Sequence, residues 1–258
     1  MADRIPIVGG NWKMNLHRAE AEALSGELTK AIAEEAVEVV VCPAFCYLGQ
    51  VGSALEGGLL RLGAQDVYHE ANGAFTGEIS CSMLKDVGVE WVLTGHSERR
   101  HVIGENDVLI NAKTRAALEA GLKVILCVGE KIEQREAGQT DAINIAQLHY
   151  GLAGVAAAQM PNVVIAYEPV WAIGTGKTAT AEDAQSAHRA IRSALESMYD
   201  ANVAQATRIQ YGGSVKPANA AELYAQNDVD GFLVGGASLK SEDFSSIVSA
   251  AAQAVTTG

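Results

Sequence analysis

The segment at residues 163–169 reads Val163-Val164-Ile165-Ala166-Tyr167-Glu168-Pro169, a short run of apolar, mostly β-branched residues that ends in one carboxylate. Such a run is typical of a strand that is buried on both faces, as in a parallel sheet. Proline cannot extend the hydrogen-bonded ladder, so Glu168 is expected at the C-terminal end of the strand. The small residues from Ala172 to Gly176 then predict a loop that closes over the carboxylate as a lid. An acidic strand end in solvent, followed by an ordinary surface loop, is the alternative.

The same alternation of a short apolar run and a longer helical pattern extends along the whole chain. Strands are expected at 5–11, 37–42, 59–65, 90–95, 122–128, 162–168, 207–212 and 230–235. Helical patterns lie near 17–34, 47–55, 80–87, 106–120, 140–158, 180–201, 217–226 and 241–256. Eight strand–helix units in about 250 residues match a closed (β/α)8 TIM barrel, with parallel strands ringed by helices, better than an open sheet. No change of composition marks a boundary, so a single α/β barrel domain is expected over residues 1–258.

Counting argues against two nucleotide-binding motifs in the lid. A Walker P-loop requires glycine five residues before Gly176, where the chain has Trp171. Gly174, Gly176 and Ala179 fit the spacing of a dinucleotide fingerprint. That fingerprint follows directly on its strand, however, whereas residues 169–173 intervene here.

The composition favours one large globular domain. The chain has 258 residues, of which 48% are hydrophobic and 19% charged, so it can bury a full core. Its start lacks a basic region followed by a long apolar one, and no apolar run reaches the length of a transmembrane helix, so we expect a cytoplasmic protein. The net charge of −12 argues against nucleic acid and acidic membrane surfaces as partners. A site for an anionic substrate would need a placed cation and helix N-termini to overcome that charge.

The four cysteines, Cys42, Cys46, Cys81 and Cys127, lie in or beside apolar runs. No histidine or second cysteine pair follows Cys42 and Cys46 at the spacing of a metal site. Buried free thiols are therefore expected. For Cys127, near the end of a strand, we favour a packing role over that of a sensitive thiol.

The active site of such a barrel lies at the C-terminal ends of the strands. The residues expected there are Asn11 and Lys13 after the first strand, Gly95, His96, Ser97 and Glu98 after the fourth, Glu168 after the sixth, Gly212, Gly213 and Ser214 after the seventh, and Gly235 and Gly236 after the eighth. Each alone has an ordinary explanation as a solvated lysine, a structural histidine or a turn. A cation, an imidazole, a carboxylate and two glycine turns at one end of the barrel together predict a catalytic site.

Four blocks of sequence carry a resemblance to a known family. They are Gly10-Asn11-Trp12-Lys13-Met14-Asn15, Gly95-His96-Ser97-Glu98-Arg99-Arg100, Tyr167-Glu168-Pro169-Val170-Trp171-Ala172-Ile173-Gly174-Thr175-Gly176 and Tyr211-Gly212-Gly213-Ser214-Val215. In order and spacing they resemble the signature segments of the triosephosphate isomerase family, and the resemblance covers the whole chain. The chain departs from the family at Ala181, where proline is frequent, and at Cys42 and Cys46, which the chemistry does not need.

The resemblance implies interconversion of dihydroxyacetone phosphate and glyceraldehyde 3-phosphate, a reaction of glycolysis and gluconeogenesis, without cofactor or metal. By resemblance, Glu168 would be the base that moves a proton between two carbons, and His96 would polarise the carbonyl and shuttle a proton between the oxygens. Lys13 would hold the phosphate and balance the enediolate charge, and Asn11 would hydrogen-bond the substrate. A free glutamate, with a pKa of about 4.3, is a weak base for a carbon acid, so lid closure is expected to raise its basicity.

The phosphate is expected at the glycine turns. The residues expected to bind it are Asn11, Lys13, Gly174, Ser214, Gly235 and Gly236. Backbone N–H groups can point at one dianion there, because no Cβ obstructs the three glycines and a helix follows the last strand.

Further residues are expected to support the site. Ser97 and Glu98 are neighbours of His96. By resemblance, Tyr211 and Ser214 would latch the closed lid to Ala179 and Gly176.

A long connection with little periodicity, residues 65–79, is unusual in a compact barrel. In the family that the chain resembles, this loop enters the neighbouring subunit. Thr76 would then steady the region around the partner's Asn11, and Glu78 would pair with the partner's Arg99, which implies a homodimer. A surface loop without a partner is the alternative.

Two other functions stay open. Another phosphate-binding barrel enzyme, such as a lyase or an epimerase, would share the glycine turns but would not need Glu168 under a lid opposite His96 and Lys13. A non-catalytic barrel that binds a phosphosugar would bind it without exchanging a proton at a substrate carbon.

Overall fold

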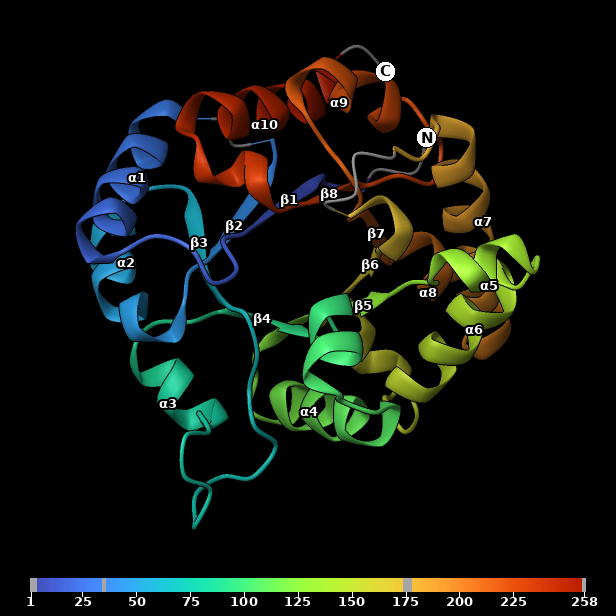
Figure 1. Ribbon diagram of the computed structural model, residues 1–258, viewed down its shortest axis with the longest axis horizontal. Helices are drawn as coiled ribbons and strands as arrows, with labels where there is room; N and C mark the ends of the chain where they lie inside the picture. Colours follow the sequence, from blue (N-terminus) through green and yellow to red (C-terminus); the bar gives the residue numbers. More distant parts are fainter. Residues whose placement is uncertain (1–3, 34–35, 174–177, 257–258) are drawn as a thin grey trace.

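The computed structural model describes residues 4–33, 36–173 and 178–256, and within them it forms a closed parallel barrel ringed by helices (Figure 1). The strands are β1 (Ile7–Asn11), β2 (Glu38–Cys42), β3 (Leu60–Ala64), β4 (Trp91–Thr94), β5 (Lys123–Val128), β6 (Val163–Tyr167), β7 (Arg208–Tyr211) and β8 (Gly231–Val234). Each strand pairs with the next in the chain, and Ile7 of β1 lies opposite Gly231 of β8 to close the ring. The predicted barrel is therefore confirmed, and every strand lies within its predicted range.

The helices lie outside the barrel and cover its strands (Figure 1). The α-helices are α1 (Arg18–Ala31), α2 (Leu48–Leu55), α3 (Cys81–Asp86), α4 (Asp107–Glu119), α5 (Ile132–Glu136), α6 (Thr140–Gly151), α7 (Ala181–Met198), α8 (Ala201–Ala206), α9 (Pro217–Tyr224) and α10 (Ser241–Thr256). The shorter turns are η1 (Phe45–Tyr47), η2 (Arg99–Ile103), η3 (Ala157–Asn162), η4 (Val170–Ala172) and η5 (Gly236–Leu239), of which η2 is a π-helical turn.

Two helical predictions were too long. The pattern over 140–158 is α6 followed by η3, because the chain leaves the helix after Gly151 and turns at Gly154, whose φ of +75° is left-handed. The pattern over 180–201 breaks after Met198. There the side chain of Asp200 accepts a hydrogen bond from the Val203 N–H at 2.8 Å and starts α8 as its N-cap.

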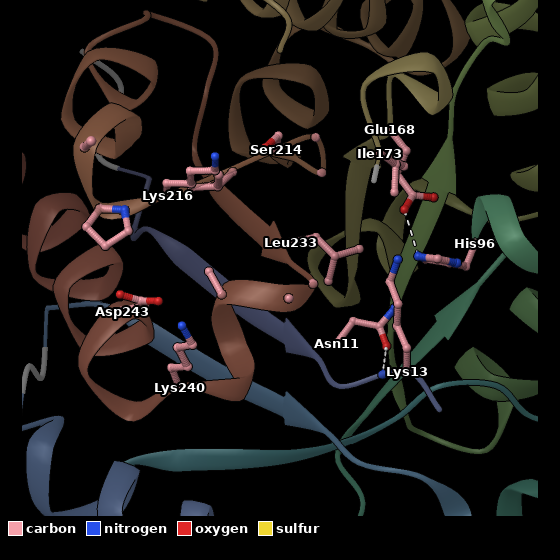
Figure 2. Close-up of a pocket in the computed structure, with 18 residues that line it drawn as sticks. Asn11, Lys13, His96, Glu168, Ile173, Ser214, Lys216, Leu233, Lys240 and Asp243 are labelled. Carbon is pink, nitrogen blue, oxygen red and sulfur yellow. Dashed lines mark hydrogen bonds and ion pairs between the residues drawn. The ribbon is translucent and has the colours of Figure 1, made fainter. Parts of the chain in front are cut away.

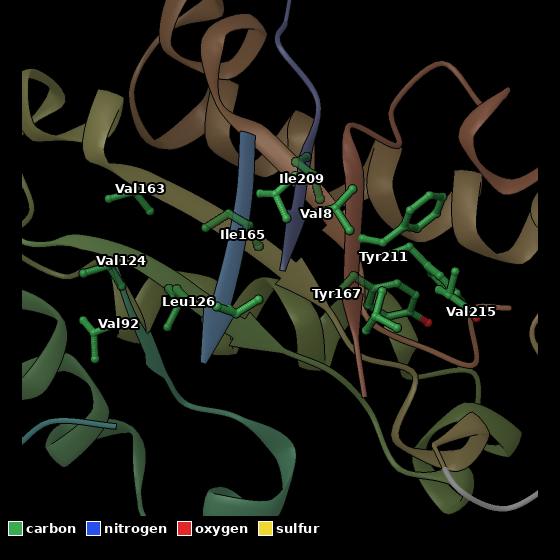
Figure 3. Packing of buried hydrophobic residues seen from close by; sticks show 14 of the residues in the cluster. Val8, Val92, Val124, Leu126, Val163, Ile165, Tyr167, Ile209, Tyr211 and Val215 are labelled. Atoms are coloured by element: carbon green, nitrogen blue, oxygen red, sulfur yellow. The ribbon is translucent and has the colours of Figure 1, made fainter. Parts of the chain in front are cut away.

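Both faces of the strands are apolar, which explains the continuous hydrophobic runs of the sequence. In β6, Val164 and Ala166 belong to the core inside the barrel, whereas Val163, Ile165 and Tyr167 pack in the layer between strands and helices (Figure 3). Each fully buried side chain of this kind stabilises the fold by about 1.5–3 kcal/mol. The strands are therefore held from both sides, and their C-terminal ends are fixed relative to one another.

Charged side chains meet at the opposite, N-terminal ends of the strands. Glu38 accepts hydrogen bonds from Trp91 Nε1 at 3.1 Å and Arg208 at 2.6 Å, and Lys123 lies 3.3 Å away. Burial raises the pKa of Glu38, but the two cations outweigh it and hold that pKa below its usual value. This arrangement caps the barrel at the end that does not carry the predicted site.

The connection between β3 and α3 projects away from the ring of helices (Figure 1). A bridge between Tyr68 and Ser80 joins its two ends, and the ring of Phe75 lies 4.9 Å from that of Tyr68. Thr76, near its tip, is exposed. The loop therefore has internal contacts but stands off its own barrel.

The cysteine prediction was wrong at one position. Cys42, Cys81 and Cys127 are buried free thiols, whereas Cys46 is exposed. Cys46 lies in η1, one turn beyond the end of β2, so its apolar neighbours do not place it in the core. None of the helices in the described ranges is long and apolar enough to cross a membrane.

Candidate active site

A cavity of about 630 Å³ opens at the C-terminal ends of the strands (Figure 2). Among the residues singled out in the sequence, those that line it are Asn11, Lys13, His96, Glu168, Gly212, Gly213, Ser214, Gly235 and Gly236. They come from the ends of five different strands. The barrel thus brings to one cavity residues that are more than 200 positions apart.

Glu168 is buried at the end of β6, and both of its carboxylate oxygens are engaged. Oε1 lies 2.9 Å from His96 Nε2, and Oε2 accepts a hydrogen bond from the backbone N–H of Ser97 at 2.9 Å. Two glycines make room for it. A Cβ at Gly129 would lie 1.8 Å from the Glu168 carbonyl oxygen, and one at Gly212 would lie 2.9 Å from its Cγ.

This environment lowers the basicity of the carboxylate. Burial raises the pKa of Glu168, but His96, the Ser97 N–H and the charge of Lys13 outweigh burial, and the pKa lies below its usual value. The raised basicity expected on lid closure is not a property of this arrangement. Among the groups that lower this pKa, His96 has the largest effect, ahead of the Ser97 N–H and Lys13.

His96 is held at the end of β4 by the start of the next helical turn. The backbone N–H of Glu98 donates to His96 Nδ1 at 3.2 Å. In the neutral ring Nδ1 is therefore the acceptor, and the proton lies on Nε2, which faces Glu168. The imidazole thus presents an N–H donor to the cavity.

Lys13 follows β1 in a left-handed backbone conformation, with φ of 53°. Its N–H donates to Asn11 Oδ1 at 3.0 Å, and its carbonyl accepts from Gln65 Nε2 at 2.8 Å. Non-glycine residues rarely adopt such a φ, and those that do are often found at functional sites. The Lys13 ammonium lies 2.7 Å from Glu98 Oε1, so Glu98 contacts the site through Lys13.

The glycine turn after β8 lies beside this cation, and the turn after β7 lines the same cavity. A Cβ at Gly235 would lie 3.3 Å from Lys13 Cε, whereas no atom lies within 4 Å of the place where a Cβ at Gly236 would stand. η5 begins at Gly236, and the Ser214 carbonyl accepts a hydrogen bond from Asn219 Nδ2 at 3.0 Å. The turns are thus anchored, with open space toward the cavity at Gly236.

Tyr211 is buried beneath the turn after β7. Burial raises the pKa of its hydroxyl, and the nearby Ala179 N–H acts in the opposite direction, although no described residue forms a hydrogen bond of good geometry with that hydroxyl. A Cβ at Gly213 would lie 2.2 Å from that hydroxyl. Gly174 and Gly176, the lid residues predicted to bind phosphate and to meet the latch, lie outside the described residues.

The barrel rule, applied to the fifth strand, would also have found Glu130. This buried carboxylate accepts hydrogen bonds from Tyr167 Oη at 3.1 Å and Trp171 Nε1 at 2.8 Å. It therefore ties the end of β6 to η4, where the predicted lid would begin. No sequence pattern indicated Lys216, Lys240 and Asp243, which also line the cavity. None indicated the role of Gln65, which does not line the cavity but holds the Lys13 carbonyl.

Thr76 is not part of this cavity, because it lies on the projecting loop. Within the described ranges, no three His, Cys, Asp or Glu side chains are placed together so that they could hold a metal ion.

Comparison with known proteins gives one consistent result. The family model described as triosephosphate isomerase matches residues 6–251. A triosephosphate isomerase from Alkaliphilus oremlandii is 51% identical over 245 residues, which cover 95% of this chain and 99% of the relative. The triosephosphate isomerase from Herpetosiphon aurantiacus is 52% identical over 95% of this chain and 98% of the relative. The one from Rhodopirellula baltica is 49% identical over 98% of this chain and 100% of the relative.

Proposed function

The chain belongs to the triosephosphate isomerase family, and from this premise we propose how its residues interconvert dihydroxyacetone phosphate and D-glyceraldehyde 3-phosphate. The reaction moves one proton from a carbon beside a carbonyl to the neighbouring carbon, through an enediolate. The observation that carries the proposal is the short distance, 2.9 Å, between Glu168 Oε1 and His96 Nε2, with Lys13 in the same cavity.

Glu168 is the base of the proposed mechanism. On substrate binding the carboxylate leaves its contacts with His96 and the Ser97 N–H, which together lower its pKa, and then removes and returns the proton of the substrate carbon. His96, with its proton on Nε2, polarises the carbonyl and moves a proton between the two oxygens. Because acid–base catalysis of this kind supplies only about 10²–10⁴-fold, stabilisation of the enediolate charge must supply much of the rest.

Lys13 provides that charge in the proposal, and Asn11 adds a hydrogen bond to a substrate oxygen. The phosphate dianion is proposed to lie at the turns formed by Ser214, Gly235 and Gly236, where the two glycines have no Cβ to obstruct their backbone N–H groups. The proposed phosphate contact of Gly174 concerns a residue outside the described ranges. With base, acid and cation all supplied by side chains, the chemistry needs no cofactor or metal.

Tyr211 and Ser214 are proposed to hold a closed lid that excludes water during the reaction. The support is the buried Tyr211 hydroxyl, which the nearby Ala179 N–H affects by lowering its pKa but which forms no hydrogen bond of good geometry with a described residue. Tyr211→Phe should then lower turnover and increase loss of phosphate from the intermediate. Unchanged values for both would contradict the latch.

The protein is proposed to act as a homodimer through loop 65–79. The support is a set of exposed apolar side chains on the loop, on neighbouring α3 and on η2: Phe75, Met83, Val102 and Ile103. Thr76 would then support the partner's Asn11. Phe75→Asp should give a less active monomer in light scattering, whereas Leu59→Asp, at an equal exposure of 38% elsewhere, should stay dimeric. A fully active native monomer would contradict the dimer.

Three further assignments complete the proposal. The enzyme works in the cytoplasm, its reaction belongs to glycolysis and gluconeogenesis, and residues 1–258 form one barrel domain.

The mechanism is tested by turnover of glyceraldehyde 3-phosphate in deuterated water. The native chain should be fast and should place solvent deuterium on the product carbon. Glu168→Asp, which withdraws the carboxylate by one methylene, should lower kcat by about 10²–10⁴-fold. The control is Glu27→Asp, the same change at an exposed position of α1. Phosphate binding without turnover in the native chain would instead favour a phosphosugar-binding barrel.

A further inference from the structure

The cavity extends beyond the phosphate turns to a second group of charged residues. Lys216, Lys240 and Asp243 line it on the side away from His96 and Glu168 (Figure 2). Lys216 follows the turn after β7, and Lys240 follows the turn after β8, at the end of η5. Each of the two glycine turns is thus followed by one lysine at the mouth of the cavity.

The backbone of both lysines is fixed while their ammonium groups stay free. The Lys216 N–H donates to Asn219 Oδ1 at 2.8 Å, and the Lys240 carbonyl accepts from the Phe244 N–H at 3.0 Å. Both side chains are exposed, and neither forms an ion pair with any residue in the described ranges. This distinguishes them from Lys13, whose charge is matched by Glu98 at 2.7 Å.

The mouth therefore carries a local positive excess on a negative protein. Asp243, which forms no ion pair with a described residue either, offsets one of the two lysine charges. The chain as a whole has a net charge of −12, so its overall field repels a phosphate dianion. Charges at the entrance of a cleft attract an approaching anion before it binds. They therefore change the rate of encounter more than the geometry of the bound state.

We propose that Lys216 and Lys240 form a capture site for the phosphate dianion of the substrate at the mouth of the cavity. The inference rests on the proposed function, because it takes the phosphate turns as the destination of that anion. The two lysines raise the encounter rate and the affinity of the initial complex. They do not contact the reacting carbons, which lie at Glu168 and His96, and they take no part in the chemical step.

The test is kcat/KM as a function of ionic strength for the native chain and for the double variant Lys216→Gln, Lys240→Gln. We expect kcat to be unchanged and kcat/KM to fall about two- to fivefold at low salt, where the Debye length is about 30 Å. The difference should shrink toward 1 M salt, where that length is about 3 Å. Lys30→Gln with Arg189→Gln is the control, because it removes two exposed positive charges outside the cavity.

A second variant, Asp243→Asn, should change kcat/KM in the opposite direction. It removes the carboxylate from the same mouth, so kcat/KM should rise at low salt while kcat stays constant. The proposal is overturned if the double lysine variant matches its control, or if Asp243→Asn lowers kcat/KM. A native chain that does not turn over would instead refute the proposed function, so the two failures are distinguishable.

Discussion

The ammonium group of Lys13 lies 2.7 Å from Glu98 Oε1, although the two residues are 85 positions apart in the chain. A second contact places this carboxylate near the site, because its other oxygen lies 3.7 Å from His96 Nδ1. Glu98 lies at the start of the turn after β4, and Lys13 follows β1. One half-exposed carboxylate therefore orients the cation of the site and lies beside its imidazole.

Glu98→Gln should lower kcat by about 10-fold, because the amide oxygen still accepts from Lys13 but the charge assistance of about 1–1.5 kcal/mol that helps to position Lys13 is lost. KM should change much less, since Lys13 keeps its charge. Steady-state kinetics measures both. Glu90→Gln serves as the control, because Glu90 pairs with Arg61 at 3.5 Å outside the cavity. Equal kinetics of the two variants would show that Glu98 has no positioning role.

Gly129→Ala and Gly212→Ala should fail in different ways. The Cβ at position 129 would lie 1.8 Å from the backbone of Glu168, so the ends of the strands must separate. The protein should then lose about 4–5 kcal/mol of stability, as in the most destabilising core substitutions. The Cβ at 212 meets the movable Glu168 Cγ at 2.9 Å, so the fold should survive while kcat falls.

The two glycine variants are separated by measuring urea midpoints together with kcat. Gly26→Ala is the control, because nothing lies within 4 Å of its Cβ in α1 and alanine favours a helix. A stable and fully active Gly212→Ala would refute the close packing against Glu168.

A buried charge cluster beneath the loop region should be sensitive to the loss of its lysine. Lys113 Nζ lies 2.8 Å from Asp66 Oδ2 and also contacts Glu105, and Arg99 bonds both carboxylates. Lys113→Met should cost about 3–5 kcal/mol of stability, because it leaves buried carboxylates without their main partner. Chemical denaturation at pH 7 measures this loss, with Lys30→Met at an exposed site as the control. A loss below that of an ordinary surface change would contradict the prediction.

His188 should make stability depend on pH. Burial, together with Arg192, lowers its pKa to about 4, and its Nδ1 lies 3.0 Å from the Asp228 carbonyl. The unfolded chain takes up a proton on His188 near pH 6.5. The contribution of neutral His188 to folding stability is therefore complete above that pH and is lost as the pH falls from 6.5 to 4. The difference between the pKa values of the unfolded and the folded chain corresponds to about 3 kcal/mol of folding stability.

The pH dependence is read from the free energy of unfolding of the native chain and of His188→Gln between pH 4 and 7. The variant should have the shallower slope. His149→Gln, which changes an exposed histidine of α6, should keep the native slope. Identical slopes for all three proteins would show that His188 is not buried in its neutral form.

The sequence predicted the barrel well because both faces of its strands are apolar and the strand ends carry glycine and polar residues. The same rule placed Asn11, His96, Glu168 and Ser214 at one end. It could not show how these side chains pair, since the contact of Lys13 with Glu98 and the low pKa of Glu168 depend on side-chain directions.

Other features carried no local signal. Lys216 and Lys240 look like ordinary surface lysines until two turns, more than 20 positions apart, are placed at one cavity. The over-long helix at 140–158 arose because its sequence stays compatible with a helix beyond Gly151, whereas the tertiary structure requires the chain to turn back toward β6.

The pairing of β1 with β8 has a consequence for synthesis of the protein. At this junction a Cβ at position 231 would lie 1.9 Å from the Ile7 carbonyl oxygen, so only glycine fits there. β1 therefore cannot complete its pairing until Gly231, more than 220 residues later in the chain, has been synthesised. A nascent chain that stops earlier leaves the sheet open at two edges, which are templates for association with other chains. It also lacks Gly235 and Gly236, so a truncated product would be prone to aggregate and would be without two residues of the proposed phosphate site.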